Sequence, residues 1–291
     1  MARCSVKPSH SLFVDVRGLR YHCRCWGEPD RPKLFLLHGW MDVSASFQFL
    51  VDALRRNWRV IAPDWRGYGL SDWSGSDSYW FPDYFADLDC LLERLAPGEA
   101  VDLVGHSMGS NVAGMYAGIR PERVAHLVCL EGFGMAPPRA EEAPRRYARW
   151  FEQIGKGARF RDYESFDALA QRLRHSNPRL TAARSLFLAE HWGALTPAGR
   201  VCLRADPAHK LVNPVLYRIE EAKACWRLVT APVLWVQGEG LEKRTKITAA
   251  DLAERKACFR SFKEEVMAGA GHMLHHDQPE ELAALIESFI P

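Results

Sequence analysis

The sequence lacks a strong excess of charge of either sign. Its 38 lysine and arginine residues are balanced by 36 acidic residues, for a net charge of +2. Such a balance gives no electrostatic basis for binding nucleic acid or an anionic membrane surface. No apolar run approaches the length of about 20 residues that spans a bilayer, and residues 1–10 lack the hydrophobic segment of a secretory signal. We therefore expect a soluble, cytoplasmic protein that acts on a small-molecule substrate, with no nucleic acid partner and no membrane insertion.

Paired cysteines are also missing, although the chain has eight cysteines. They are scattered along the chain, and no two have the spacing of a zinc knuckle. Free, buried thiols in a reducing compartment are the expected state. The cysteines thus predict neither disulfides nor a metal.

A sizeable core is available, because 47% of the 291 residues are hydrophobic. Residues 101–118 (VDLVGHSMGSNVAGMYAG) read as a buried strand, a sharp turn and a helix. In a Gly-x-Ser-x-Gly turn the flanking glycines allow a strained backbone that exposes the central hydroxyl above the sheet. We therefore take Ser107 as the candidate nucleophile.

Two backbone N–H groups are candidates for binding an oxyanion beside Ser107. Met108 directly follows the nucleophile and opens a helix, whose N-terminus favours negative charge. Trp40 ends the segment His38-Gly39-Trp40, which follows a buried strand at residues 33–37. This position suits the second donor of an oxyanion hole.

A histidine and a carboxylate complete the candidate site. His272 lies on a glycine-flanked loop after the last predicted strand, a position that suits a general base. Glu131 follows the strand at residues 124–130, where open α/β sheets place their ligands. His272, His275 and His276 could instead be metal ligands, but no matching carboxylate cluster accompanies them in the sequence. We therefore expect no metal and no cofactor.

Residues 134–228 differ in composition from the flanking segments, since strand alternation stops and the chain becomes helical and rich in arginine. Inserted after a strand, this segment is expected to lie above the strand ends as an all-helical cap. The candidates for lining a pocket beneath this cap are four aromatic residues, Trp150, Phe151, Phe187 and Trp192. Of these, we predict that Trp150, Phe151 and Trp192 bind the substrate.

The loop at residues 64–72 (DWRGYGLSD) contains two charged residues that could be mistaken for catalytic groups. A local ion pair between Asp64 and Arg66 that braces the loop is the expected arrangement, because buried charges are usually paired.

With these motifs together, the chain resembles the α/β-hydrolase superfamily, and its residues 201–240 are similar to the serine-hydrolase-like branch. The resemblance implies a mostly parallel, eight-stranded sheet flanked by helices, with a core at residues 1–133 and 229–291 and a helical cap at residues 134–228. It also implies a Ser–acid–His triad with Ser107 as nucleophile and His272 as base. It rests on HGW at 38–40, DWRGYGLSD at 64–72, GHSMG at 105–109, RPERVAHLVCLEG at 120–132 and GAGHMLHHDQPEEL at 269–282.

The chain departs from many relatives in the acid of the triad. Those relatives have an aspartate at the position that Leu241 occupies here. Some relatives place the carboxylate after the sixth strand, which corresponds to Glu131. Glu239 and Glu242 remain alternatives. The aspartate nucleophile of haloalkane dehalogenases and epoxide hydrolases is absent, because Ser107 occupies that position.

These residues favour hydrolysis of an ester through an acyl-enzyme intermediate. Thioester, lactone or carbon–carbon bond hydrolysis are alternatives that use the same groups. A receptor with the hydrolase fold that binds a small apolar ligand with little turnover, and cofactor-free oxidation, are further hypotheses. The sequence leaves the oligomeric state open, with a homodimer as one alternative.

Overall fold

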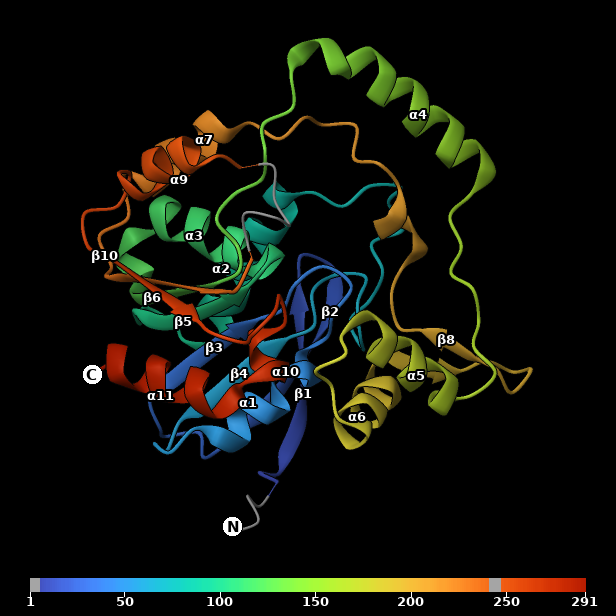
Figure 1. The fold of residues 1–291 in the computed structure, drawn as a ribbon, viewed down its shortest axis with the longest axis horizontal. Helices are drawn as coiled ribbons and strands as arrows, with labels where there is room; N and C mark the ends of the chain where they lie inside the picture. Colours follow the sequence, from blue (N-terminus) through green and yellow to red (C-terminus); the bar gives the residue numbers. More distant parts are fainter. Residues whose placement is uncertain (1–5, 241–246) are drawn as a thin grey trace.

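The computed structural model describes residues 6–240 and 247–291 and is built on an eight-stranded sheet (Figure 1). The expected α/β-hydrolase architecture is confirmed. In spatial order the strands are β1 (Ser9–Val16), β2 (Leu19–Trp26), β4 (Arg59–Pro63), β3 (Lys33–Leu37), β5 (Val101–His106), β6 (Val124–Leu130), β9 (Val233–Gly238) and β10 (Phe262–Met267).

The sheet is parallel except around β2, which pairs antiparallel with both β1 and β4. The reversal follows from a tight turn at Arg17 and Gly18, where both residues have positive φ angles of 49° and 80°. From β4 to β10 all neighbouring pairs are parallel. Their carboxyl ends therefore meet at one edge, the edge at which such sheets place their functional groups.

Helices cover both faces of the sheet, because successive strand residues point to opposite sides. In β3, Phe35 and Leu37 belong to the core on one face, whereas Leu34 and Leu36 belong to the core on the other. The first face is covered by α2 (Phe81–Leu95), α3 (Met108–Ile119), α7 (Ile219–Trp226) and α9 (Ala249–Lys256), and the second by α1 (Gln48–Ala53), α10 (Leu274–Asp277) and α11 (Pro279–Phe289) (Figure 1).

Several predicted elements differ in their bounds, and two of them bear on how the chain packs. The helix expected at residues 42–55 is a 3₁₀ turn at η1 (Ser44–Phe47) followed by the short α1. The last strand was expected at residues 259–266 but runs from Phe262 to Met267, because Phe259 stacks on Phe133 and Trp226 in the core. Within the described residues, no helix combines the length and the apolar character needed to cross a membrane.

The segment between β6 and α7 forms the cap, at one side of the sheet (Figure 1). Its helices are α4 (Ala143–Lys156), α5 (Phe166–Ser176) and α6 (Ala182–Trp192). The 3₁₀ turn η3 (Ala140–Glu142) leads into α4, and η4 (Pro207–Lys210) lies between α6 and α7. α5 and α6 enclose a small core of their own that includes Leu169, Ala189 and Val201. α7 lies inside the range expected for the cap, yet it packs on α3, where Gly118 approaches the Cys225 carbonyl.

The expectation of an all-helical cap is wrong. Strands β7 (Gly193–Leu195) and β8 (Val201–Leu203) form an antiparallel hairpin after α6. Its turn is closed by hydrogen bonds from the Thr196 N–H to the Arg200 carbonyl and from the Gly199 N–H to the Thr196 carbonyl. Strands of three residues are too short to show the alternation by which a strand is recognised in a sequence.

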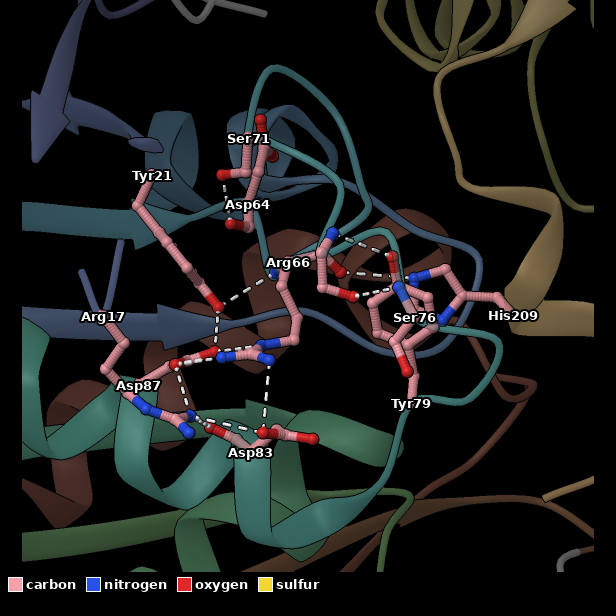
Figure 2. A network of polar contacts seen from close by, with 11 residues as sticks. Arg17, Tyr21, Asp64, Arg66, Ser71, Ser76, Tyr79, Asp83, Asp87 and His209 are labelled. Carbon is pink, nitrogen blue, oxygen red and sulfur yellow. Dashed lines mark hydrogen bonds and ion pairs between the residues drawn. The ribbon is translucent and has the colours of Figure 1, made fainter. Parts of the chain in front are cut away.

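The loop at residues 64–72 is fixed by a buried ionic network on α2 (Figure 2). Arg66 donates to both carboxylate oxygens of Asp87, from Nε at 2.5 Å and Nη2 at 2.6 Å. Asp87 is fully buried and also accepts hydrogen bonds from the Tyr21 hydroxyl and from Arg17 Nη1. The backbone N–H of Arg66 in turn donates to the Tyr21 hydroxyl. Asp87 thus holds three donors from different segments of the chain.

The predicted ion pair between Asp64 and Arg66 is therefore wrong. Asp64 lies 2.7 Å from Nδ1 of His22 and accepts hydrogen bonds from the backbone N–H groups of Ser44 and Leu70. Burial acts to raise the pKa of Asp64, but the hydrogen bond and charge of His22 outweigh it and lower that pKa to about 2. Asp64 and Arg66 thus each pair with a residue that is distant in the sequence, and a local sequence pattern does not reveal such a partner.

Replacing Asp87 by asparagine tests whether this network stabilises the fold. We expect Asp87→Asn to lower the free energy of unfolding by about 3–5 kcal/mol, because it removes the buried counter-charge of Arg66 and leaves that guanidinium only the half-exposed Asp83. Asp83→Asn is the matched control: Asp83 also contacts Arg66 but is 39% exposed, so its loss should cost less than about 1 kcal/mol. Urea denaturation of both variants measures the difference, and equal losses would contradict the role assigned to Asp87.

Candidate active site

Ser107 lies at the turn between β5 and α3 with a strained backbone. Its φ and ψ are 52° and −111°, in a region that residues other than glycine rarely adopt. The flanking glycines are required by space: a Cβ on Gly109 would lie 2.1 Å from the Leu37 carbonyl oxygen, and one on Gly105 would lie 2.5 Å from the Gly109 carbonyl oxygen. The Ser107 N–H donates to the Leu130 carbonyl at 2.8 Å. The turn predicted from the sequence is thus present, and it fixes Ser107 at the strand end.

His272 and Glu131 come together from opposite ends of the chain. Nδ1 of His272 lies 3.0 Å from Oε2 of Glu131, which can only accept, so Nδ1 carries the proton. The other carboxylate oxygen of Glu131 accepts the Gly238 N–H at 2.5 Å. The Glu131 side chain is fully buried, whereas that of His272 is 44% exposed. This arrangement leaves the lone pair on Nε2 of His272, the state that a general base requires.

The structure places the three carboxylates considered for the acid differently. Glu131, at the end of β6, is in contact with His272. Glu239 directly follows β9, and its backbone N–H donates to the Ala270 carbonyl. Glu242 lies outside the described residues. The observed contact favours Glu131 as the partner of the histidine.

Ser107, His272 and Glu131 border one cavity of about 550 Å³. Both predicted oxyanion donors, Trp40 and Met108, border it as well. The backbone at Gly39, which directly precedes Trp40, lies against Ser107, since a Cβ on Gly39 would lie 3.1 Å from Cβ of Ser107. The remaining lining residues are Tyr79, Trp80, Phe81, Tyr84, Asn111, Gly132, Gly134, Met135, Ala208, His209, Leu211 and Asn213.

The cap residues predicted to bind substrate do not line this cavity. Trp150 and Phe151 lie on α4, which has no buried residue, and Phe151 is 60% exposed. Trp192 lines a separate cavity of about 150 Å³ between cap and core. The physical reason is the placement of α4, which stands away from the strand ends (Figure 1).

Sequence reasoning missed the aromatic residues that do line the cavity. Tyr79, Trp80, Phe81 and Tyr84 precede or begin α2 and form most of its aromatic wall. Their signal was the dense run YWFPDY at residues 79–84. This run lies in the core part of the sequence, whereas the predicted substrate-binding residues lie in the segment expected to form the cap.

A second histidine of the cavity is held neutral at the joint between cap and core. The His209 ring is stacked between the rings of Tyr68 and Tyr79, each at a centroid distance of 3.8 Å. Its Nε2 lies 3.2 Å from the Arg66 carbonyl (Figure 2). The Tyr79 hydroxyl donates to Asp206 at 2.7 Å. Burial lowers the pKa of His209 to about 3 despite the hydrogen bond to the Arg66 carbonyl. The ring is therefore uncharged at neutral pH.

The cavity offers almost no charge to a substrate. Among the described residues that line it there is no lysine, arginine or aspartate, and its carboxylate, Glu131, is paired with His272. Aromatic and aliphatic side chains form most of the wall. The site is thus suited to an uncharged, largely apolar molecule with a polar group near Ser107.

The three histidines near the C-terminus have different environments. His272 faces the cavity, whereas His275 and His276 on α10 are buried. The carboxylate that the structure brings near His275 is that of Asp42, whose Oδ2 lies 3.6 Å from Nε2 of His275. Asp42 belongs to the loop after β3 and is distant from His275 in the sequence.

Comparison with known proteins places these features in a family. The family model described as alpha/beta hydrolase fold matches residues 32–279. The expected similarity to the serine-hydrolase-like branch is confirmed by a serine hydrolase-like protein of Danio rerio. It is 28% identical over 277 residues, which cover 91% of this chain and 83% of that protein.

Two further relatives show the same relationship. The 2-(acetamidomethylene)succinate hydrolase of Mesorhizobium japonicum is 28% identical over 285 residues, which cover 96% of this chain and 95% of that enzyme. A thioesterase domain from the curacin biosynthetic pathway shares the fold, with a TM-score of 0.84 and 24% identity over 97% of this chain and 99% of that one. Since the family model spans most of the sheet, the segment that forms the cap and the strand-end groups, the chain belongs to the alpha/beta hydrolase fold family.

Proposed function

We propose that the protein is a serine hydrolase that cleaves an ester of a small, largely apolar substrate through an acyl-enzyme intermediate. The observation that carries the proposal is the contact of His272 with the buried carboxylate of Glu131, in the same cavity as the strained Ser107. A serine alone is a weak nucleophile, and a base oriented by a third group is what activates it.

In the proposed mechanism, Nε2 of His272 takes the proton of the Ser107 hydroxyl while its Oγ attacks the ester carbonyl carbon. The backbone N–H groups of Trp40 and Met108 stabilise the oxyanion of the tetrahedral intermediate. His272 then donates the proton to the leaving alkoxide, and the carbon–oxygen bond breaks. Water, deprotonated by His272, then attacks the acyl carbon, and the acyl–Oγ bond breaks as His272 returns the proton to Ser107 Oγ and the acid leaves. Glu131 stays ionised and stabilises the imidazolium that forms in each step.

The cavity lining narrows the substrate class. A relative acts on 2-(acetamidomethylene)succinate, which carries two carboxylates. This chain presents no lysine or arginine among the described lining residues, so a dianion would lose its hydration without a compensating positive charge. We infer an uncharged ester with an aromatic or aliphatic portion that packs against Trp80 and Phe81. Thioesters and lactones of the same character would meet the same groups.

Removing the Ser107 hydroxyl tests the nucleophile. We expect Ser107→Ala to lower kcat for p-nitrophenyl butyrate by at least about three orders of magnitude, as triad deletions do in other serine hydrolases. Ser110→Ala is the matched control: it lies on the same helix and its hydroxyl donates to the Gly132 carbonyl, so activity should stay within about tenfold.

Full turnover by Ser107→Ala would contradict the proposal. If folded wild type binds an apolar ester but does not cleave it, the receptor hypothesis replaces the hydrolase.

Replacing the acid tests the orientation of the histidine. We expect Glu131→Gln to lower kcat by about three to four orders of magnitude. If the glutamine NH₂ group faces His272, it disfavours the tautomer that leaves Nε2 free; if it faces the Gly238 N–H, two donors oppose each other and the side chain is displaced.

Glu239→Gln is the control, because Glu239 is the other described carboxylate considered for this role, and it should retain nearly full activity. Steady-state kinetics on both variants decide between them. A large loss in Glu239→Gln with little loss in Glu131→Gln would overturn the assignment.

A further inference from the structure

Behind the catalytic cavity, Asp42, His275 and His276 form a cluster of buried ionisable side chains. Asp42 follows β3, and the two histidines lie on α10. Their exposed fractions are 2%, 0% and 2%, respectively. One possible ligand atom from each residue lies within 4.8 Å of the other two. None of the three residues borders the catalytic cavity.

Several donor and acceptor atoms of this cluster lack a hydrogen-bond partner. Oδ1 of Asp42 accepts hydrogen bonds from the Val43 N–H and the Ser46 hydroxyl, but Oδ2 has none. Both ring nitrogens of His275 and Nε2 of His276 are likewise without a hydrogen-bond partner. Buried polar atoms are almost always hydrogen-bonded, so a group of unpartnered atoms at one place indicates a bound species between them.

The chemistry of these atoms matches a metal of the zinc type. One carboxylate oxygen and two imidazole nitrogens are ligands that Zn²⁺ takes at about 2.0–2.2 Å in tetrahedral geometry, which puts adjacent ligand atoms about 3.3 Å apart. Oδ2 of Asp42 and Nε2 of His275 are 3.6 Å apart, too long for a hydrogen bond and close to that ligand separation. Ca²⁺ and Mg²⁺ prefer all-oxygen sites and fit these donors poorly.

We propose that Asp42, His275 and His276 bind one transition-metal ion of the Zn²⁺ type. Asp42 also borders the cavity of about 150 Å³ between cap and core, which gives the ion a route and room for a water as fourth ligand. The Arg184 guanidinium, which donates to the His276 carbonyl at 2.8 Å, is a nearby positive charge that opposes the ion. A moderate affinity is therefore expected.

The site is structurally coupled to the catalytic loop. The His275 ring lies 4.6 Å from the ring of His106, centroid to centroid. Nε2 of His106 lies 2.8 Å from the His272 carbonyl and donates to it. An ion bound to His275 and Asp42 would thus be separated from the segment that carries His272 by the His106 ring alone. At this position the ion could influence the orientation of His272 but would not contact the substrate.

Calorimetric titration of chelator-treated protein with Zn²⁺, followed by the absorption spectrum of the Co²⁺ form, tests the site. Wild type should bind one Zn²⁺ per chain and show the intense visible bands of tetrahedral Co²⁺. Asp42→Asn and His276→Gln should each weaken binding by about a hundredfold or more, because loss of a ligand costs at least as much as loss of a group that orients one.

Two controls keep the result specific. His126→Gln removes a histidine that pairs with Asp102 at 2.8 Å elsewhere on the sheet, and it should bind Zn²⁺ like wild type. Ser107→Ala should also bind Zn²⁺ like wild type. The metal site can therefore be tested separately from the proposed hydrolase activity. No binding by wild type, or unchanged binding in His276→Gln, would overturn the proposal. If Asp42→Asn does not fold, the results for wild type and His276→Gln decide.

Discussion

The close approach of the turn at residues 105–109 to β3 is the constraint on which the site depends. Without a side chain, Gly109 lets the start of α3 lie directly against the Leu37 carbonyl. This contact fixes the helix above the sheet, aims its N-terminus at the cavity and holds Ser107 in a strained conformation. Any larger residue at Gly109 would displace the helix, Ser107 and the Met108 N–H together. The strain at Ser107 is compensated by the rigid packing of α3 on the sheet.

The joint between cap and core completes the cavity from the other side. His209 belongs to the cap but is stacked between Tyr68 and Tyr79 of the core. Because burial keeps its pKa near 3, the joint is made of uncharged rings and does not bring a positive charge to the substrate. The Arg66–Asp87 network supports the loop that carries Tyr68. The Arg66–Asp87 ion pair thus stabilises a loop that supports the cavity wall, and neither of its charged groups borders the cavity.

The parts of the site that follow strand ends could be predicted from the sequence. Ser107, Glu131 and His272 each follow a predicted strand, and parallel strands bring such positions to one edge of the sheet. What could not be predicted depends on contacts between distant segments. Asp87 replaces Asp64 as the partner of Arg66, Asp42 meets His275 across the chain, and the cavity wall comes from residues 79–84. Trp150 and Phe151 do not line the cavity because α4 stands away from it. Helical periodicity predicts which face of a helix is apolar but not which element that face contacts.

The most direct test of the proposed function is peptide mapping by mass spectrometry after treatment of the folded protein with a fluorophosphonate. Such reagents form a stable adduct only with a serine whose hydroxyl is activated by an adjacent base. The account predicts one adduct per chain, located on the peptide that contains Ser107. Absence of an adduct on folded protein, or its location on another residue, would contradict the claim that Ser107, His272 and Glu131 form a working triad.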